Sequence, residues 1–141
     1  MSIGQVSTIC LSLFLLSGYG VTQDFDACKY RGNSRTERVC VIPYIYLMAH
    51  PEKFDGRDVA FSAWARTAGD VTLVFPTKEA MEDGESVSSI VIYGNETASD
   101  LNQRNLDSRV VVKGKFYLAE GKVDPLDVER LGVLRNAEVL P

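Results

Sequence analysis

The stretch HPEKFDGRDVAFSAWA, residues 50–65, holds a chain turn followed by the start of a β-strand. Pro51 disfavours helical geometry at the residue before it, so any preceding helix ends near His50. Asp55 and Gly56 are the residue types of a flexible corner. From residue 59 the side chains alternate with a period of two, which predicts a strand. The two faces of this strand are Val59, Phe61, Ala63 and Ala65 on one side, and Ala60, Ser62, Trp64 and Arg66 on the other.

A short helix is predicted just before this turn, within VIPYIYLMAH (41–50). Pro43 suits its first turn, where a fixed φ and a missing N–H are tolerated. Helical spacing places Ile42, Ile45 and Ala49 on one face, with Leu47 and Met48 beside it. We expect this to be the apolar face of the helix.

Four further strands are predicted at residues 71–76, 88–94, 109–119 and 131–140, where apolar runs are bounded by turn residues. In 71–76, alternation groups Val71, Leu73 and Phe75, and we expect Val74 to face outward. In 109–119, Val110, Val112, Gly114 and Phe116 share one face, and Val111, Lys113, Lys115 and Tyr117 share the other. Gly114 fits a strand that bends sharply.

Two helices separate these strands. Residues 77–84 predict a short helix with Thr77 as its N-cap and Gly84 closing its C-terminus. Residues 96–108 predict a polar helix that starts at a capping-box-like pair, Thr97 and Asp100. Residues 120–130 predict a loop.

After the leading helix, the main elements run strand, strand, strand, helix, strand, strand. This is the order of the OB-fold, a small five-stranded Greek-key β-barrel. The inward period-two residues of such a barrel form its core, and closure removes exposed strand edges. We therefore predict a mostly β, OB-fold-like domain over residues 42–141.

The stretch YIYLMAHPEKFDGRDVAFSAWA (44–65) resembles the opening of a family of small, uncharacterised, exported bacterial proteins with an OB-fold-like domain. Pro51, Glu52, Phe54 and Gly56 match the family's turn, and Val59 and Phe61 match its first strand. FPTKEAMEDG (75–84) resembles the family's short charged helix, and RVVVKGKF (109–116) a later strand. This chain departs from the pattern at His50, Phe54 and Ala63, where Asn, Tyr and Gly are usual. The resemblance implies the fold and export, and it brings no activity.

The first twenty residues carry no acidic or basic side chain and include an apolar run from Ile9 to Leu16. This run is shorter than the ~20 residues of a membrane span. It is typical of a secretory signal cleaved after Gly20, with a buried N-terminal helix as the alternative. Cys10 precedes most of the run, which is the wrong order for a lipoprotein. We expect residues 1–20 to be a signal peptide, and the mature protein to be periplasmic or secreted without a membrane span.

Cleavage would leave two cysteines, Cys28 and Cys40. A pair in an oxidising compartment is typical of a disulfide, and a ring of this size stabilises by roughly 3 kcal/mol. A metal site that includes His50 would lack the short ligand spacings and the fourth ligand of zinc sites. We therefore predict a disulfide-tethered N-terminal arm over residues 21–41 and no metal.

No catalytic constellation is recognisable. The chain has one histidine, His50, which we interpret as a helix-end residue because a general base needs positioned partners. There is no Gly-x-Ser-x-Gly, His-Glu-x-x-His or phosphate-loop pattern. We expect a protein that is not an enzyme and needs no cofactor. The net charge of -4 also argues against binding to bulk nucleic acid or to anionic membranes.

The outer surface of the barrel is the remaining candidate for function. OB-folds usually bind ligands on their second and third strands, with the loops after the first and fourth strands at the rim. Arg66 and Thr67 are expected in the first of these loops, and Lys122 and Arg130 in the second. Aromatic residues interleaved with bases can stack on sugars or nucleotide bases. The candidate ligand-binding residues are Trp64, Arg66, Tyr93, Lys113, Lys115 and Tyr117.

Two functions fit these observations. The first is a monomeric, non-catalytic binding module of the bacterial cell envelope, whose partner is a protein or a small ligand. The second is an oligonucleotide- or glycan-binding barrel that uses the aromatic and basic face. The acidic net charge favours the first. Trp64 is either the floor of a binding site or covered by the segment from Cys28 to Leu47, and we expect the cover.

Overall fold

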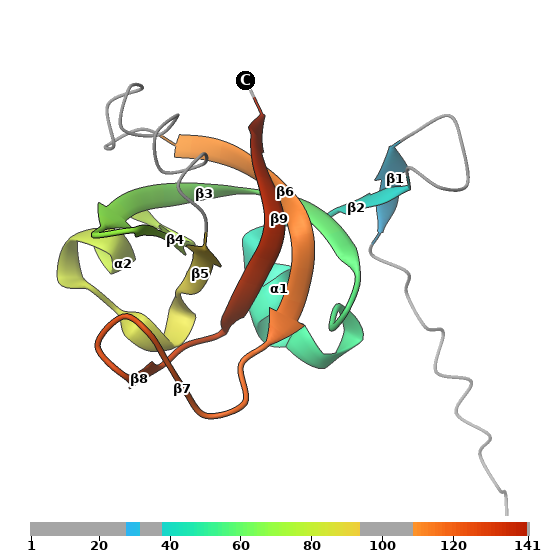
Figure 1. The fold of residues 1–141 in the computed structure, drawn as a ribbon. Helices are drawn as coiled ribbons and strands as arrows, with labels where there is room; N and C mark the ends of the chain where they lie inside the picture. The colour runs from blue at the N-terminus through green and yellow to red at the C-terminus, as the bar shows by residue number, and fades with distance from the viewer. Residues whose placement is uncertain (1–27, 32–37, 94–108, 141) are drawn as a thin grey trace, which may run out of the picture.

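Strand β3 (Asp58–Ala68) is paired along both of its edges, and this closes a five-stranded barrel. It pairs antiparallel with β4 (Val71–Phe75) on one edge and with β6 (Arg109–Leu118) on the other. The circuit continues from β4 to β5 (Ile90–Tyr93), from β5 to the parallel β9 (Gly132–Leu140), and from β9 to β6 (Figure 1). The predicted OB-fold-like barrel is confirmed, because strand order and pairing are those of this Greek key.

The computed structural model describes residues 28–31, 38–93 and 109–140. The predicted signal peptide (1–20) and the predicted polar helix (96–108) lie outside the described residues. Within the described ranges, no helix is long and apolar enough to cross a membrane.

The period-two pattern of β3 correctly identifies the barrel interior. Val59, Phe61, Ala63 and Ala65 are all buried in one core cluster, together with Ile90 and Ile92 of β5, Val112 and Phe116 of β6, and Leu134 of β9. The prediction that Val74 faces outward is wrong. Val74 is opposite Ala65 in the β3–β4 register and is buried in the same core. Leu73 and Phe75 take the outer face instead.

Gly114 lies at the predicted bend. The β6–β9 register shifts between Lys113 and Lys115, which marks a β-bulge. A Cβ atom at Gly114 would lie 2.7 Å from Cγ of Leu134 and 2.9 Å from the carbonyl oxygen of Arg135. Glycine is therefore required here by the close approach of β9, as expected for a strand that curves around a small barrel.

Helix α1 (Tyr44–Ala49) is present and ends before Pro51 as predicted, and Ile42 and Leu47 of the predicted apolar side are buried, but Tyr44 and not Ile45 enters the core. Tyr44 and Leu47 are buried, whereas Ile45 is 68% exposed. A 3-10 turn, η1 (Pro51–Lys53), follows and leads into β3. Spacing alone cannot identify the buried face of a six-residue helix, because so short a helix has little periodicity.

Tyr44 attaches α1 to the barrel. Its ring packs edge-on against Phe61 at 5.0 Å between centroids. Its hydroxyl donates to the carbonyl of Ser88 at 2.8 Å and also lies 3.0 Å from the carbonyl oxygen of Val74. Burial raises the pKa of Tyr44 well above its ordinary value, because the charged phenolate would lose its hydration. Tyrosine suits this position because its apolar ring fills the core while its hydroxyl reaches the backbone carbonyls at the edge of the core.

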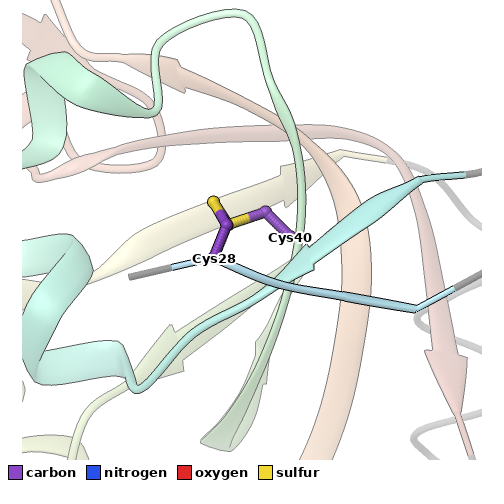
Figure 2. Close-up of a disulfide and its surroundings, with 2 residues drawn as sticks. All are labelled: Cys28 and Cys40. Carbon is purple, nitrogen blue, oxygen red and sulfur yellow. A yellow bond between two sulfur atoms is a disulfide. The ribbon is translucent and has the colours of Figure 1, made fainter. Parts of the chain in front are cut away.

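The N-terminal arm adds two strands to the barrel sheet. β1 (Lys29–Arg31) pairs with β2 (Val39–Val41), and β2 runs parallel to β3 with Cys40 opposite Val59. Cys28 and Cys40 form the predicted disulfide, with their Cα atoms 4.8 Å apart (Figure 2). Cys40 is buried in the core cluster, and Cys28 packs against that cluster. The disulfide is therefore part of the core as well as a tether.

The inward and outward positions of β3 can be compared in neighbouring variants. Phe61→Ala should lower the free energy of unfolding by about 3–5 kcal/mol, because it leaves a cavity beside Tyr44. Ser62→Ala, which changes a partly exposed side chain, should change it by less than about 0.5 kcal/mol. Denaturant unfolding measures both. Small and equal effects would contradict the alternation.

The Tyr44 hydroxyl gives a second prediction. Tyr44→Phe should lower the free energy of unfolding by about 1–2 kcal/mol, because the buried carbonyl of Ser88 loses its donor. The raised pKa means that the folded state holds the neutral phenol, so this stabilisation is complete below the unfolded pKa of about 10 and declines above it. The wild-type and variant stabilities should therefore converge as pH rises above about 10. A constant difference from pH 8 to pH 11 would contradict a buried neutral phenol.

Candidate binding faces

Helix α2 (Lys78–Asp83) covers the outer face of β4, on which OB-folds usually bind their ligands. The helix begins and ends as predicted: the Thr77 side chain accepts a hydrogen bond from the Ala80 N–H at 3.1 Å, and Gly84 has a left-handed conformation. Its apolar side packs on β4 and β5. The resulting α2 cluster consists of Leu73, Phe75, Ala80, Met81 and Val91. This part of the usual ligand face is therefore occupied by the chain itself.

The predicted loop 120–130 contains a small hairpin, β7 (Lys122–Val123) and β8 (Val128–Glu129). Val123 packs against the α2 cluster. Two side chains bind carbonyls in the hairpin turn: the Tyr93 hydroxyl donates to Asp124 at 3.3 Å, and Nη2 of Arg130 donates to Pro125 at 2.7 Å. The hairpin is thus fastened to the barrel beside α2.

Arg130 was expected at an accessible loop rim, but it is only 8% exposed. Its Nη1 donates to Oγ of Ser89 at 2.7 Å, so the side chain joins the hairpin turn to the segment that leads into β5. Burial lowers the pKa of Arg130, and the nearby Tyr93 acts in the opposite direction. No carboxylate in the described part of the chain bonds to Arg130. Its two hydrogen bonds hold the hairpin turn against the segment before β5. The sequence does not indicate this burial, because Arg130 is the last residue of a predicted loop of polar composition.

The six predicted ligand-binding residues fall into two groups on the barrel. Trp64 and Arg66 pair with Phe75 and Leu73 of β4, and Tyr93 pairs with Val71 of the same strand. In the β3–β6 register, Lys113 lies opposite Ala60 and Lys115 lies opposite Asp58, at the other end of β3. Tyr117 follows them on β6. The structure therefore does not bring the six together in one site. Arg66 and Thr67, expected in a loop, belong to β3.

Trp64 is half-buried, and it packs against the α2 cluster. The expectation that the segment from Cys28 to Leu47 covers it is wrong for the described part of that segment. The arm pairs with β3 at Val59 and Ala60, whereas Trp64 lies at the β4 end of the strand. Period two places Trp64 outside the barrel as predicted, but the partner is a helix that follows β4.

The outward side of β6 carries the second group, and we call it the β6 face: Val111, Lys113, Lys115 and Tyr117 of β6, with Arg135 of the adjacent β9. The guanidinium of Arg135 lies 5.2 Å from the centre of the Tyr117 ring, a cation–π arrangement. Lys113 pairs with Glu138 at 3.7 Å. Val111 and Tyr117 are more than a third exposed. Arg135 was not predicted, because only the β6–β9 pairing places it beside Tyr117.

The described residues contain no group of three His, Cys, Asp or Glu side chains placed to hold a metal ion. His50 follows the last residue of α1, and its ring contacts Tyr46 at 5.0 Å between centroids. This is the placement expected of a helix-end residue.

No protein-family model matches the chain, and no curated protein matches it. Two solved structures that align with it are both asparaginyl-tRNA synthetase of Entamoeba histolytica, one of them in complex with asparaginyl-adenylate. Sequence identity is 19% for the complex and 18% for the other structure, and the TM-score is 0.42 in both cases. The alignments cover 72% of this chain but only 23% of the synthetase chains. The fold assignment rests on strand order and register.

The contact between Trp64 and α2 can be tested by fluorescence. Met81→Ala should remove part of the α2 cluster against which Trp64 packs, lower the free energy of unfolding by about 2–5 kcal/mol and shift the Trp64 emission to the red. The double variant Cys28→Ser, Cys40→Ser should leave the emission of the folded protein unchanged, because the described arm lies at the other end of β3. The reverse pattern would show that the arm, and not α2, covers Trp64.

Proposed function

We propose that this protein is an exported, non-catalytic binding module of the bacterial cell envelope that uses the β6 face as its binding surface. The observation that carries the proposal is the distribution of cover over the barrel. Chain segments fill the outer face of β4, whereas the β6 face keeps an exposed aromatic and an exposed aliphatic side chain beside cationic groups. Exposed apolar groups framed by polar ones are typical of interaction surfaces.

Export is supported by two independent features. The charge-free, apolar start of the sequence is typical of a secretory signal. The Cys28–Cys40 disulfide fits an oxidising compartment, where such bonds persist. Together they favour the periplasm or the exterior of the cell as the place where the module acts.

The composition of the β6 face favours an acidic partner with apolar groups. Lys115 and Arg135 supply positive charge, while Tyr117 and Val111 supply contact area. A protein or peptide that carries carboxylates beside an aliphatic side chain matches both features, because complementary charge steers association and apolar burial holds the complex.

An oligonucleotide or a glycan is the second candidate for the same face. It is favoured by the Tyr117 ring, which can stack on a base or a sugar, and by the neighbouring cations. The net charge of -4 disfavours long nucleic acids, because their binding depends on the neutralisation of many phosphates.

Binding of short probes would test the β6 face. The probes are an acidic, leucine-containing peptide, a single-stranded oligothymidylate and a chito-oligosaccharide, each titrated into the mature protein by calorimetry. We expect the acidic peptide to bind, and Lys115→Glu to weaken its binding about tenfold or more through charge reversal. Arg66→Glu is the matched control, since it makes the same charge change at the end of β3 that is remote from Lys115, and it should retain binding.

Three results would contradict this proposal or change its ligand. Equal loss of binding in Lys115→Glu and Arg66→Glu would mean that only net charge matters. Preferential binding of the oligonucleotide or the glycan, with loss in Tyr117→Ala, would favour the second candidate. Failure of all three probes to bind would refute a β6 binding site for these ligand classes.

A further inference from the structure

Charge is segregated between two parts of the described chain. Residues 78–93 and 120–130, which form α2, the 3-10 turn η2 (Ser86–Ser88), β5 and the β7–β8 hairpin, hold eight acidic and three basic residues. The other described residues hold five acidic and ten basic residues. We call the first part the acidic lobe. In Figure 1, α2 and the hairpin lie at the left and lower left of the barrel, whereas β6 passes over the top and descends beside β9 to the point where the chain leads into the hairpin.

The tip of the hairpin exposes an apolar side chain in a disfavoured backbone conformation. Leu126 has a φ of 73° and is 85% exposed. Leucine rarely adopts this left-handed conformation, and here its side chain gains no burial within the described part of the fold. Asp127 follows with a φ of 50°. Such conformations at an exposed position suggest a role in an interaction.

A second exposed apolar side chain belongs to the same lobe. Val87 of η2 is 56% exposed, and η2 contacts β8 of the hairpin. Exposed carboxylates accompany both apolar residues: Glu82, Asp83, Glu85, Asp124, Asp127 and Glu129. The exposed bases of α2 and the hairpin are Lys78, paired with Glu82 at 3.3 Å, and Lys122. The lobe thus combines aliphatic groups with an excess of negative charge.

The hairpin turn is fastened where an interaction element would need support. The Tyr93 and Arg130 side chains bind the carbonyls of the two residues that precede Leu126. Val123 of β7 packs against the α2 cluster and so holds the hairpin on it. These contacts order the hairpin before any partner binds, which reduces the entropic cost of association.

The partner chemistry that suits the acidic lobe is present on the same chain. We infer that the protein associates head to tail, with the acidic lobe of one copy docked on the β6 face of a second copy. Leu126 would contact Tyr117, while the hairpin carboxylates approach Lys115 and Arg135 beside it. This inference rests on the proposed function, because it names the acidic, leucine-bearing partner of that face. It replaces the expectation of a monomer.

Such a contact joins two different surfaces, so every assembly that does not close into a ring keeps one free lobe and one free face at its ends. Association should therefore be open-ended, dependent on concentration and weakened by salt. Sedimentation velocity of the mature protein should show a weight-average sedimentation coefficient that rises between about 10 μM and 1 mM at low salt. The rise should be smaller at about 0.5 M salt.

Two variants remove one surface each. Leu126→Gly deletes the side chain at a φ that glycine accepts, so its Tm should equal or exceed that of the wild type while association is lost. Lys115→Glu should lose association through the β6 face. Ile45→Ala is the control, since it truncates an exposed aliphatic residue of α1 outside both surfaces and should associate like the wild type.

Mixing the two variants gives the decisive result. The Leu126→Gly copy retains its β6 face and the Lys115→Glu copy retains its lobe, so an equimolar mixture should form dimers that grow no further. A wild-type protein that stays monomeric throughout the concentration range, or a mixture that stays monomeric, would overturn the inference. If that monomeric protein still binds the acidic peptide through Lys115, the proposed function stands without self-association. If it binds none of the three probes either, both proposals fail.

Discussion

The pairing of β3 with β6 over Asp58 to Trp64 is the constraint on which the rest of the structure depends. It closes the sheet and so fixes which side of every strand is inside. Closure in a small barrel requires strong curvature, and the bulge at Gly114 provides it where β9 crosses closely. Because side chains alternate, the same register that buries Phe61 and Val112 places Ser62 and Val111 outside.

Closure leaves the outer surface to be divided among the remaining segments. The short stretch between β4 and β5 folds back as α2 and covers β4, and the segment between β6 and β9 folds as a hairpin beside it. Tyr44 attaches α1 to β4 and η2 through the carbonyls of Val74 and Ser88, while the disulfide joins the arm to the core. On the β6 face, Val111 and Tyr117 stay more than a third exposed, which is why we propose this face as the binding surface.

The sequence predicted the barrel well because closed β-structures have strong local signals. Alternation in residues 59–65 identifies the inward set of β3, and Thr77 and Gly84 mark both ends of α2 through capping that is local in sequence. It failed where a side chain responds to a distant partner. The burial of Tyr44 and Arg130 depends on Ser88 and Ser89, more than forty residues away in sequence, and that of Val74 depends on the register of β4 against β3.

By itself, the sequence determined the strand order, the inward and outward residues of β3 and β6, the position of the bend and the cysteine pair. Each follows from periodicity, backbone preference or composition within about ten residues. Only the tertiary structure decided the grouping of the candidate binding residues. Barrel pairing separates Trp64, Arg66 and Tyr93 from Lys113, Lys115 and Tyr117, and it brings Arg135 beside Tyr117. The physical reason is that strand register decides which residues of different strands lie side by side on a closed sheet. The sequence of one strand does not specify its register against the next.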